Sequence, residues 1–251
     1  MTTVGAKPLI SIITVVLNRA ETIGLAINSV QSQTYKNVEH VIQDGGSDDG
    51  TVNIIKSLAP EAMLEIKPDG GIYEAINRAI ERAEGDIVGL MHSDDQFASS
   101  DILDFVEEKF RDQRIDGIYG DLNYVSSHSS EKAIRKWIAG TFEMKKITRG
   151  WMPPHPTLYV RKSVFKKHGV YDCSYSISAD YEAMLRWITH GLRLAYLPKT
   201  MVIMQSGGAS NCSIKNLFRK TLEDYKAIKK NKVGGLITLF LKNMRKVVQL
   251  I

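Results

Sequence analysis

Two adjacent carboxylates, Asp94 and Asp95, follow an apolar run in the sequence DIVGLMHSDDQF (residues 86–97). The run has the length and composition of a buried strand. Like charges side by side repel each other, and a hydrophobic core has no use for them. Either the pair lies in a solvated turn or it binds a cation. Carboxylate oxygens suit Mg²⁺ or Mn²⁺, which proteins often bind together with phosphate oxygens.

Other polar residues follow apolar runs in the same way. Asn18 comes directly after residues 9–17, and Asp44 and Asp69 follow two further short apolar runs. Ligands of parallel α/β sheets bind beyond the carboxyl ends of the strands. We therefore expect these residues and the Asp94–Asp95 pair to meet at one edge of a sheet. One acidic turn would be unremarkable, but four such groups together predict a site.

The elements that position these residues alternate between strand and helix patterns. Strands are predicted over 9–17, 38–43, 63–66 and 87–91, and helices over 21–31, 51–58 and 72–83. This alternation predicts an α/β fold with a mostly parallel sheet flanked by helices. The second half is less regular, with predicted strands at 117–121, 158–160 and 192–197, a helix at 178–187, and no assignment for 122–150.

Several chemistries are excluded by their missing motifs. The segment DGGSDDGT (44–51) lacks the ligand spacing of an EF-hand, and the chain has no Gly-x-Gly-x-x-Gly after a strand, no P-loop and no Gly-x-Ser-x-Gly. These absences argue against dinucleotide oxidoreductases, NTPases and α/β-hydrolases. The two cysteines, Cys173 and Cys212, provide neither a disulfide framework nor a metal site, which indicates a reducing compartment.

Charge divides the chain into a body, residues 1–211, and a tail, residues 212–251. The tail carries ten Lys or Arg against two acids, a net charge of +8, whereas the body has 23 bases against 26 acids, a net charge of −3. Apolar tail residues recur at helical spacing, which favours an anionic membrane surface over nucleic acid as a partner. The alternative is a basic helical tail packed on its own domain. No apolar run is long enough to span a bilayer, so we expect a cytoplasmic protein.

Four stretches, 11–51, 67–95, 155–172 and 178–187, occur in the order found in family 2 glycosyltransferases. The chain resembles this family, which has the GT-A fold, and in particular its bacterial branch for O-antigen and exopolysaccharide synthesis. The resemblance implies inverting, Mn²⁺- or Mg²⁺-dependent transfer of a sugar from a nucleotide-sugar, UDP-linked by preference. The implied acceptor is a saccharide on a lipid-diphosphate carrier at the inner face of the cytoplasmic membrane.

The resemblance also implies roles on the donor side. Asp44 matches the acid that accepts a hydrogen bond from the uracil N3–H, and Asp69 matches a position near the base and ribose. Asp94 would bind the ribose and Asp95 the metal on the diphosphate. Asn18, at the same predicted edge, is a candidate nucleotide contact. The alternative, purely structural interpretation is that Asp44 forms an Asx-turn in a Gly-rich loop.

On the acceptor side, Asp180 matches the general base. The family commonly has Glu-Asp there, whereas this chain has Ala179-Asp180. His155 and Ser206 are candidate contacts to the acceptor or the diphosphate, although His155 precedes a proline where the branch often has a glutamine. His92 is expected on the far face of its strand and receives no role.

Two other functions are consistent with such a sheet. A sugar-1-phosphate nucleotidyltransferase should have a Gly-rich N-terminal loop followed by Arg and Lys, but residues 16–20 (VLNRA) contain no glycine. A non-catalytic sugar-nucleotide-binding protein would have no need for both Asp95 and Asp180, and both are present. The transferase is therefore the favoured interpretation.

Overall fold

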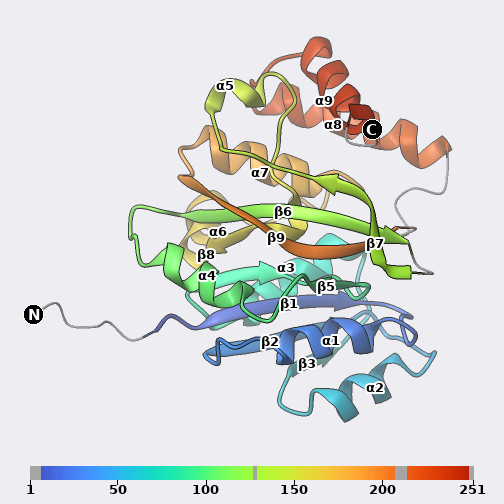
Figure 1. The fold of residues 1–251 in the computed structure, drawn as a ribbon. Helices are drawn as coiled ribbons and strands as arrows, with labels where there is room; N and C mark the ends of the chain where they lie inside the picture. The colour runs from blue at the N-terminus through green and yellow to red at the C-terminus, as the bar shows by residue number, and fades with distance from the viewer. Residues whose placement is uncertain (1–6, 127–128, 207–213, 249–251) are drawn as a thin grey trace, which may run out of the picture.

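A nine-stranded mixed sheet forms the centre of the protein (Figure 1). The computed structural model describes residues 7–126, 129–206 and 214–248. The first half of the chain contains the elements β1 (Ile10–Val16), α1 (Ile23–Gln31), β2 (Val38–Asp44), α2 (Thr51–Leu58), β3 (Met63–Ile66), α3 (Ile72–Arg82), β4 (Ile87–Leu90), β5 (Asp95–Phe97) and α4 (Ile102–Phe110). The predicted strands and helices of this half all form, with ends shifted by at most two residues.

The second half completes the sheet. It contains β6 (Gly117–Ser126), β7 (Ser129–Trp137), α5 (Met144–Ile147), the 3-10 turn η1 (His155–Thr157), β8 (Tyr159–Arg161), α6 (Lys162–His168), α7 (Ala179–Thr189), β9 (Leu194–Ser206), α8 (Ile214–Lys230) and α9 (Leu236–Val248). Strands β6 and β9 are longer than predicted, because β9 pairs along most of β6 and then with β5, whereas β8 lies within one residue of its predicted range. The unassigned stretch 122–150 holds the end of β6, all of β7, and α5.

The strand order is β3-β2-β1-β4-β8-β6-β9-β5, with β7 paired to β6. Strands β1 to β4, β6 and β9 run in one direction, and β5, β7 and β8 run in the other. The predicted mostly parallel α/β sheet is therefore confirmed. Four neighbouring parallel strands, β3-β2-β1-β4, end at the same edge, and this edge positions the site.

Each face of the sheet is covered by helices. Side chains of α1 and α4 pack on one face with Ile10, Ile12 and Ile118, and α2 extends this layer through Ile55. Side chains of α3, α6 and α7 pack on the other face with Ile13 and Val88. Because both faces are buried, the central strands are apolar throughout rather than alternating.

The tail forms two helices, α8 and α9, on either side of Gly234-Gly235. They lie over α7 on the outer side of that helical layer (Figure 1). Ala227 and Ile228 of α8 are fully buried and join the main core. Packing on its own domain, one of the two expectations for the tail, is therefore what the structure shows. Among the described residues no helix combines the length and the apolar character that crossing a membrane requires.

Candidate active site

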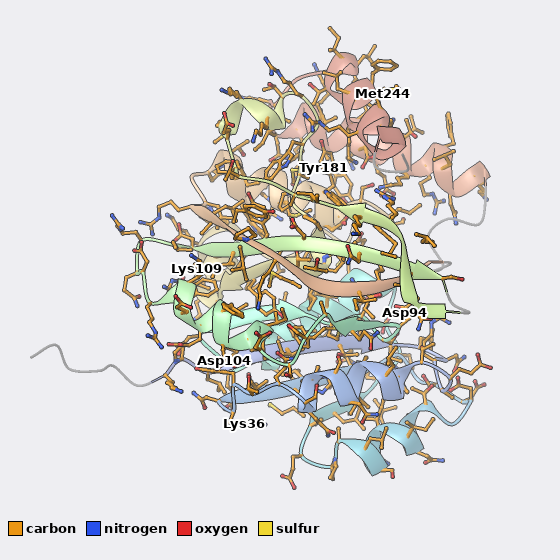
Figure 2. The ribbon with its side chains drawn as sticks, viewed as in Figure 1. Lys36, Asp94, Asp104, Lys109, Tyr181 and Met244 are labelled. Carbon is orange, nitrogen blue, oxygen red and sulfur yellow. The ribbon has the colours of Figure 1, made fainter. Side chains whose placement is uncertain are left out.

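The polar residues predicted to follow the first strands meet at one edge of the sheet. Gly45, after β2, donates a backbone hydrogen bond to the Val16 carbonyl of β1 (2.9 Å). A Cβ atom placed on Gly45 would lie 3.1 Å from Oδ2 of Asp69, the residue that follows β3. Asp94 lies at the same end of the sheet, where the β1 arrow points (Figure 2). The predicted convergence of these strand ends is thus observed.

Asp44, the last residue of β2, is fully buried, and both oxygens of its carboxylate are engaged by its own loop. Oδ1 accepts from the backbone amides of Gly46 (2.8 Å) and Ser47 (2.7 Å), and Oδ2 accepts from the Ser47 hydroxyl (2.7 Å). These are the bonds of an Asx-type turn. Asp44 therefore shapes its own loop, and its contact with the uracil N3–H stays a prediction.

Asn18 has a similar local role. Its backbone is left-handed (φ 51°), a conformation that asparagine tolerates better than most residues. Its side-chain oxygen accepts from the Asp48 backbone N–H (3.0 Å), and its own backbone N–H donates to the Ser47 hydroxyl (2.8 Å). Asn18 thus ties the end of β1 to the Asp44 loop, and through that loop it can act on a bound nucleotide only indirectly.

Asp69 is more open than Asp44. One oxygen, Oδ1, accepts from the backbone amide of Gly71 (2.9 Å) just before α3 begins. The side chain is partly exposed beside Gly45. Gly71 has a φ of 134°, a conformation that favours glycine. This turn places the Asp69 carboxylate on the surface of the strand-end edge.

Asp95 begins β5 and presents the opposite situation to Asp44. Its side chain is fully buried, and neither carboxylate oxygen makes a hydrogen bond of ordinary geometry to the described residues. Burial and the adjacent charge of Asp94 raise its pKa well above the usual range, and only the backbone amide of Gln205 acts in the other direction. A buried carboxylate with no partner is costly unless a ligand compensates it.

These residues fit a divalent cation. Two carboxylates are adjacent in the chain, neither oxygen of Asp95 has a hydrogen-bond partner of ordinary geometry within the described part of the chain, and hard oxygen donors suit Mg²⁺ or Mn²⁺. No group of three or more His, Cys, Asp or Glu side chains that could bind a metal exists within the described ranges. Sites of this kind commonly use one or two carboxylates and complete the coordination with substrate phosphates.

Asp180 occupies the second position of α7, on the helical layer beside this edge. The Tyr73 hydroxyl of α3 lies 3.2 Å from its Oδ1 and orients the carboxylate. Burial acts to raise the pKa of Asp180, but His155, Lys220 and Lys242 act in the opposite direction and the pKa falls below its ordinary value. Asp180 is therefore ionised at neutral pH, which is the state a general base requires.

Two histidines, His92 and His155, lie near the candidate base Asp180, and His92 also lies near Asp94. His155 is buried, its Nε2 lies 2.9 Å from the Tyr171 hydroxyl, and its ring centroid lies 6.2 Å from that of His92. Burial lowers the pKa of His155 to about 4, and it also lowers that of His92, where the charges of Asp94 and Asp180 act against it. Both rings are thus neutral at pH 7.

His92 lies near Asp94, Asp180 and His155, which differs from the expectation that it lies on the far face of its strand. Residues 92–95 form a turn in which the Asp95 amide donates to the His92 carbonyl (3.1 Å). The apolar pattern of the preceding strand does not predict this turn. Ser206 is the last residue of β9, and its side chain and the following residues 207–213 lie outside the described residues.

Comparisons with known proteins agree with this arrangement. The sequence model described as Glycosyl transferase family 2 matches residues 11–210. A PGL/p-HBAD biosynthesis glycosyltransferase of Mycobacterium tuberculosis (strain H37Rv) is 27% identical over 224 residues, covering 86% of this chain and 85% of that protein. An uncharacterized glycosyltransferase of the same strain is 29% identical over 198 residues, covering 72% of this chain and 69% of that protein.

Solved structures show the same fold at low identity. The mannosyltransferase PcManGT from Pyrobaculum calidifontis, in complex with GDP-Man and Mn²⁺, superposes with a TM-score of 0.68 and 16% identity, covering 95% of this chain and 70% of that one. Residues 1–349 of TarS from S. aureus, in complex with UDP-GlcNAc, give 0.66 and 17%, covering 89% and 65%. The chain spans 39% of the longer TarS chain.

These likenesses confirm the GT-A type of architecture, and the family match covers both Asp94–Asp95 and Asp180. No particular biosynthetic branch is singled out, because the named relatives above are mycobacterial glycosyltransferases. The family model matches about four-fifths of this chain. The chain therefore belongs to glycosyltransferase family 2.

Proposed function

We propose that this glycosyltransferase transfers a sugar from a UDP-sugar, with inversion and with Mn²⁺ or Mg²⁺, to a saccharide on a lipid-diphosphate carrier. The reaction would serve bacterial surface polysaccharide synthesis. One observation carries the proposal: next to the buried Asp95, whose oxygens have no hydrogen-bond partner among the described residues, Asp94 lies close enough to the ionised Asp180 that both charges act on His92. The first arrangement suits a metal-bound diphosphate, and the second suits a hydroxyl that must lose its proton.

The donor half of the site is assigned to the strand-end edge. Asp95 and Asp94 would hold the metal and the ribose, and the exposed side of Asp69 would face the base and ribose. Asp44 and Asn18 would act indirectly, by shaping the loop at residues 45–50 against which the base lies. Solved structures of the same fold bind UDP-GlcNAc, or GDP-Man with Mn²⁺, which supports a nucleotide-sugar donor and a divalent metal.

The proton transfer is assigned to Asp180. A sugar hydroxyl is a weak nucleophile, and a carboxylate within hydrogen-bond reach can accept its proton as the oxygen attacks the anomeric carbon. Tyr73 holds the carboxylate in place from α3. Attack opposite the leaving nucleoside diphosphate inverts the anomeric carbon. The bound metal would supply positive charge that stabilises the departing diphosphate.

The acceptor half of the site lies where His92 and His155 face Asp180. Both rings are neutral at pH 7, so they offer hydrogen bonds to sugar hydroxyls without adding charge. His155 is fixed by the Tyr171 hydroxyl on one side. We assign acceptor contacts to these two histidines and leave the proton to Asp180.

The tail supplies a surface for the membrane that would carry such an acceptor. Beyond the face packed on α7, the two helices expose large apolar side chains, namely Leu217, Phe218, Leu222, Leu236, Ile237, Phe240 and Met244. Met244 points outward from α9 (Figure 2). With the tail's net charge of +8, this exposed set, here called the tail apolar face, suits an anionic lipid surface rather than nucleic acid.

The direct test is transfer itself. The purified protein is incubated with Mn²⁺, individual UDP-sugars and a lipid-diphosphate saccharide extract, and released UDP and glycosylated lipid are measured. Asp180→Asn should slow transfer by roughly 10²- to 10⁴-fold while UDP affinity stays unchanged. Asp104→Asn is the control, since this acid lies on α4 at the opposite end of the sheet from Asp94 (Figure 2). Full turnover by Asp180→Asn would overturn the assignment of the base.

The membrane surface has its own test. Phe218 and Phe240 are 66% and 63% exposed, and Ile138, outside the tail, is 73% exposed. Co-sedimentation with vesicles containing 30% phosphatidylglycerol should fall at least tenfold in the Phe218→Ser/Phe240→Ser double variant and remain normal in Ile138→Ser. Equal binding by all three proteins, or a dimer through this face that excludes vesicles, would contradict the proposal.

A further inference from the structure

A single carboxylate from the tail binds three consecutive backbone amides of the loop that leads into α7. Glu223, on α8, accepts from the backbone N–H groups of Ser176 (3.0 Å), Ile177 (2.8 Å) and Ser178 (2.9 Å). Ser178 is the N-cap residue that directly precedes α7, and the first amides at a helix start have no partner within the helix. Glu223 therefore fills an anion site made by the protein itself, from about 45 residues further along the chain.

The loop that Glu223 holds also carries the proposed base. Asp180 lies two residues after Ser178, in the first turn of α7. The Tyr73 hydroxyl donates to the Ile177 carbonyl (2.6 Å) and lies 3.2 Å from Oδ1 of Asp180. The loop is thus held on its amide side by Glu223 and on its carbonyl side by Tyr73. Loss of either contact would let the start of α7, and Asp180 with it, shift.

The position of Glu223 is itself well fixed. Ala227 and Ile228, in the next turn of α8, are fully buried in the main core. One turn further on, Lys230 makes ion pairs with Asp172 (2.9 Å) and with Glu182 of α7 (3.0 Å). The helix is therefore fixed against α7 by packing and by ion pairs, and Glu223 is the residue that accepts hydrogen bonds from the backbone of the base-bearing loop.

We propose that Glu223 is a positioning residue for Asp180, so that the tail is a working part of the active site as well as a membrane-facing appendage. The family match ends at residue 210, and Glu223 lies outside it. The inference rests on the proposed function, because it requires Asp180 to be the base. It adds that residues 11–210, which match the family, do not complete the site alone in this chain, because α8 is needed to hold Asp180 in position.

A purely structural role would produce a different result from a positioning role. If Glu223 only stabilised the docking of α8, its loss would lower the melting temperature and affect kcat no more than any other loss of docking. Lys230 provides the matched comparison, because it joins the same two helices without touching the loop at residues 176–178. A positioning residue should change kcat selectively and leave the KM for the donor unchanged, since the donor lies at the strand-end edge.

The experiment compares Glu223→Ala, Glu223→Gln, Lys230→Met and Asp180→Asn in the full chain, using transfer kinetics, UDP titration and thermal melting. Glu223→Ala should lower kcat roughly 100-fold, the scale of an ångström-sized misplacement. UDP affinity and donor KM should stay within about twofold of wild type. Glu223→Gln, which keeps one acceptor oxygen, should recover part of the rate, and Lys230→Met should keep kcat within about twofold whatever its melting temperature.

The proposal would be overturned by a Glu223→Ala protein that turns over normally, or by Lys230→Met losing as much kcat as Glu223→Ala. In both cases a strong loss in Asp180→Asn would leave the proposed function standing. Full turnover by Asp180→Asn would instead remove the base on which the inference rests. If Glu223→Ala does not fold, the ratio of kcat between Glu223→Gln and Lys230→Met decides the question in the same way.

Discussion

Two buried aspartates, Asp44 at the end of β2 and Asp95 at the start of β5, make a direct comparison. Both side chains are fully buried. Asp44 accepts three hydrogen bonds from the loop that follows it, whereas neither oxygen of Asp95 has such a partner among the described residues. The carboxylate of Asp44 is therefore hydrogen-bonded by the folded protein itself, whereas the buried charge of Asp95 is compensated only when a cation binds to it.

The difference shows how one sheet edge serves both stability and function. A carboxylate whose oxygens accept from a nearby loop stabilises that loop and has less acceptor capacity left for a ligand. A carboxylate buried beside a like charge weakens the folded state but is ready to bind a cation. Sequence position alone treats these residues alike, since each is an aspartate at the end of an apolar run. Their partners assign the first to architecture and the second to the proposed chemistry.

The largest expected effect is on turnover when Asp95 is changed. Asp95→Asn keeps the shape of the side chain but removes the charge that would hold the metal on the diphosphate. We expect transfer to fall about 1,000-fold, the scale of metal stabilisation of a leaving group. The measurement is UDP release at saturating donor and Mn²⁺, with Asp104→Asn as the control. Loss of less than tenfold would show that Asp95 has no more role in chemistry than Asp44.

Changing Asp44 should affect folding instead. Asp44→Ala leaves the amides of Gly46 and Ser47 without an acceptor, and we expect the free energy of unfolding to fall by about 3 kcal/mol. Urea denaturation measures this loss. The comparison would break down if Asp44→Ala unfolded like wild type but failed to bind UDP, since Asp44 would then be a ligand contact.

A third buried group, His155, extends the comparison because its contribution to the free energy of unfolding depends on pH. Its pKa is about 4 in the folded protein and about 6.5 when unfolded, so the unfolded state binds more protons between these values. Stability from the neutral ring is fully present above pH 6.5 and is lost as the pH falls toward 4. Lowering the pH from 8 to 4.5 should therefore reduce the free energy of unfolding by about 2 kcal/mol more in wild type than in His155→Gln. Equal losses in urea melts of the two proteins would show that His155 is not buried as described.

The smallest expected effect is a gain in stability. Since the pKa of Asp95 is raised on folding, its ionisation weakens the metal-free protein above that pKa, and the penalty disappears at acid pH. Asp95→Asn should therefore stabilise the metal-free protein at pH 7 by about 1 kcal/mol, or roughly 2–4 °C in melting temperature. Calorimetric melting in chelator measures the shift. A lower melting temperature for Asp95→Asn would mean that the carboxylate is already satisfied.

The sequence predicted the first half of the fold well because its signals are local. Apolar periodicity fixed the strands from β1 to β4, and parallel pairing then brought Asn18, Asp44, Asp69 and Asp94 to one edge. It could not distinguish Asp44 from Asp95, because hydrogen bonding inside a Gly-rich loop depends on backbone geometry. In the second half, β7 and the long β9 owe their extent to pairing with β6, and nothing local marks them.

The acceptor side was harder to predict for the same reason. Asp180 was found through its resemblance to a family motif, but His92 was placed on the wrong side of the chain. Glu223 carries no sequence signal at all, because it reaches Ser176–Ser178 only through the packing of α8 on α7. Long-range contacts of this kind follow from tertiary packing and not from local propensity.

The most direct test of the account is a calorimetric titration of UDP into the wild-type protein and Asp95→Asn, each with Mn²⁺ and again with chelator. We predict micromolar binding to wild type that requires Mn²⁺ and is lost in Asp95→Asn, while that variant melts no lower than wild type in chelator. Binding of equal strength with and without Mn²⁺, or equal binding by the two proteins, would contradict the claim that Asp95 binds the metal ion that accompanies the nucleotide.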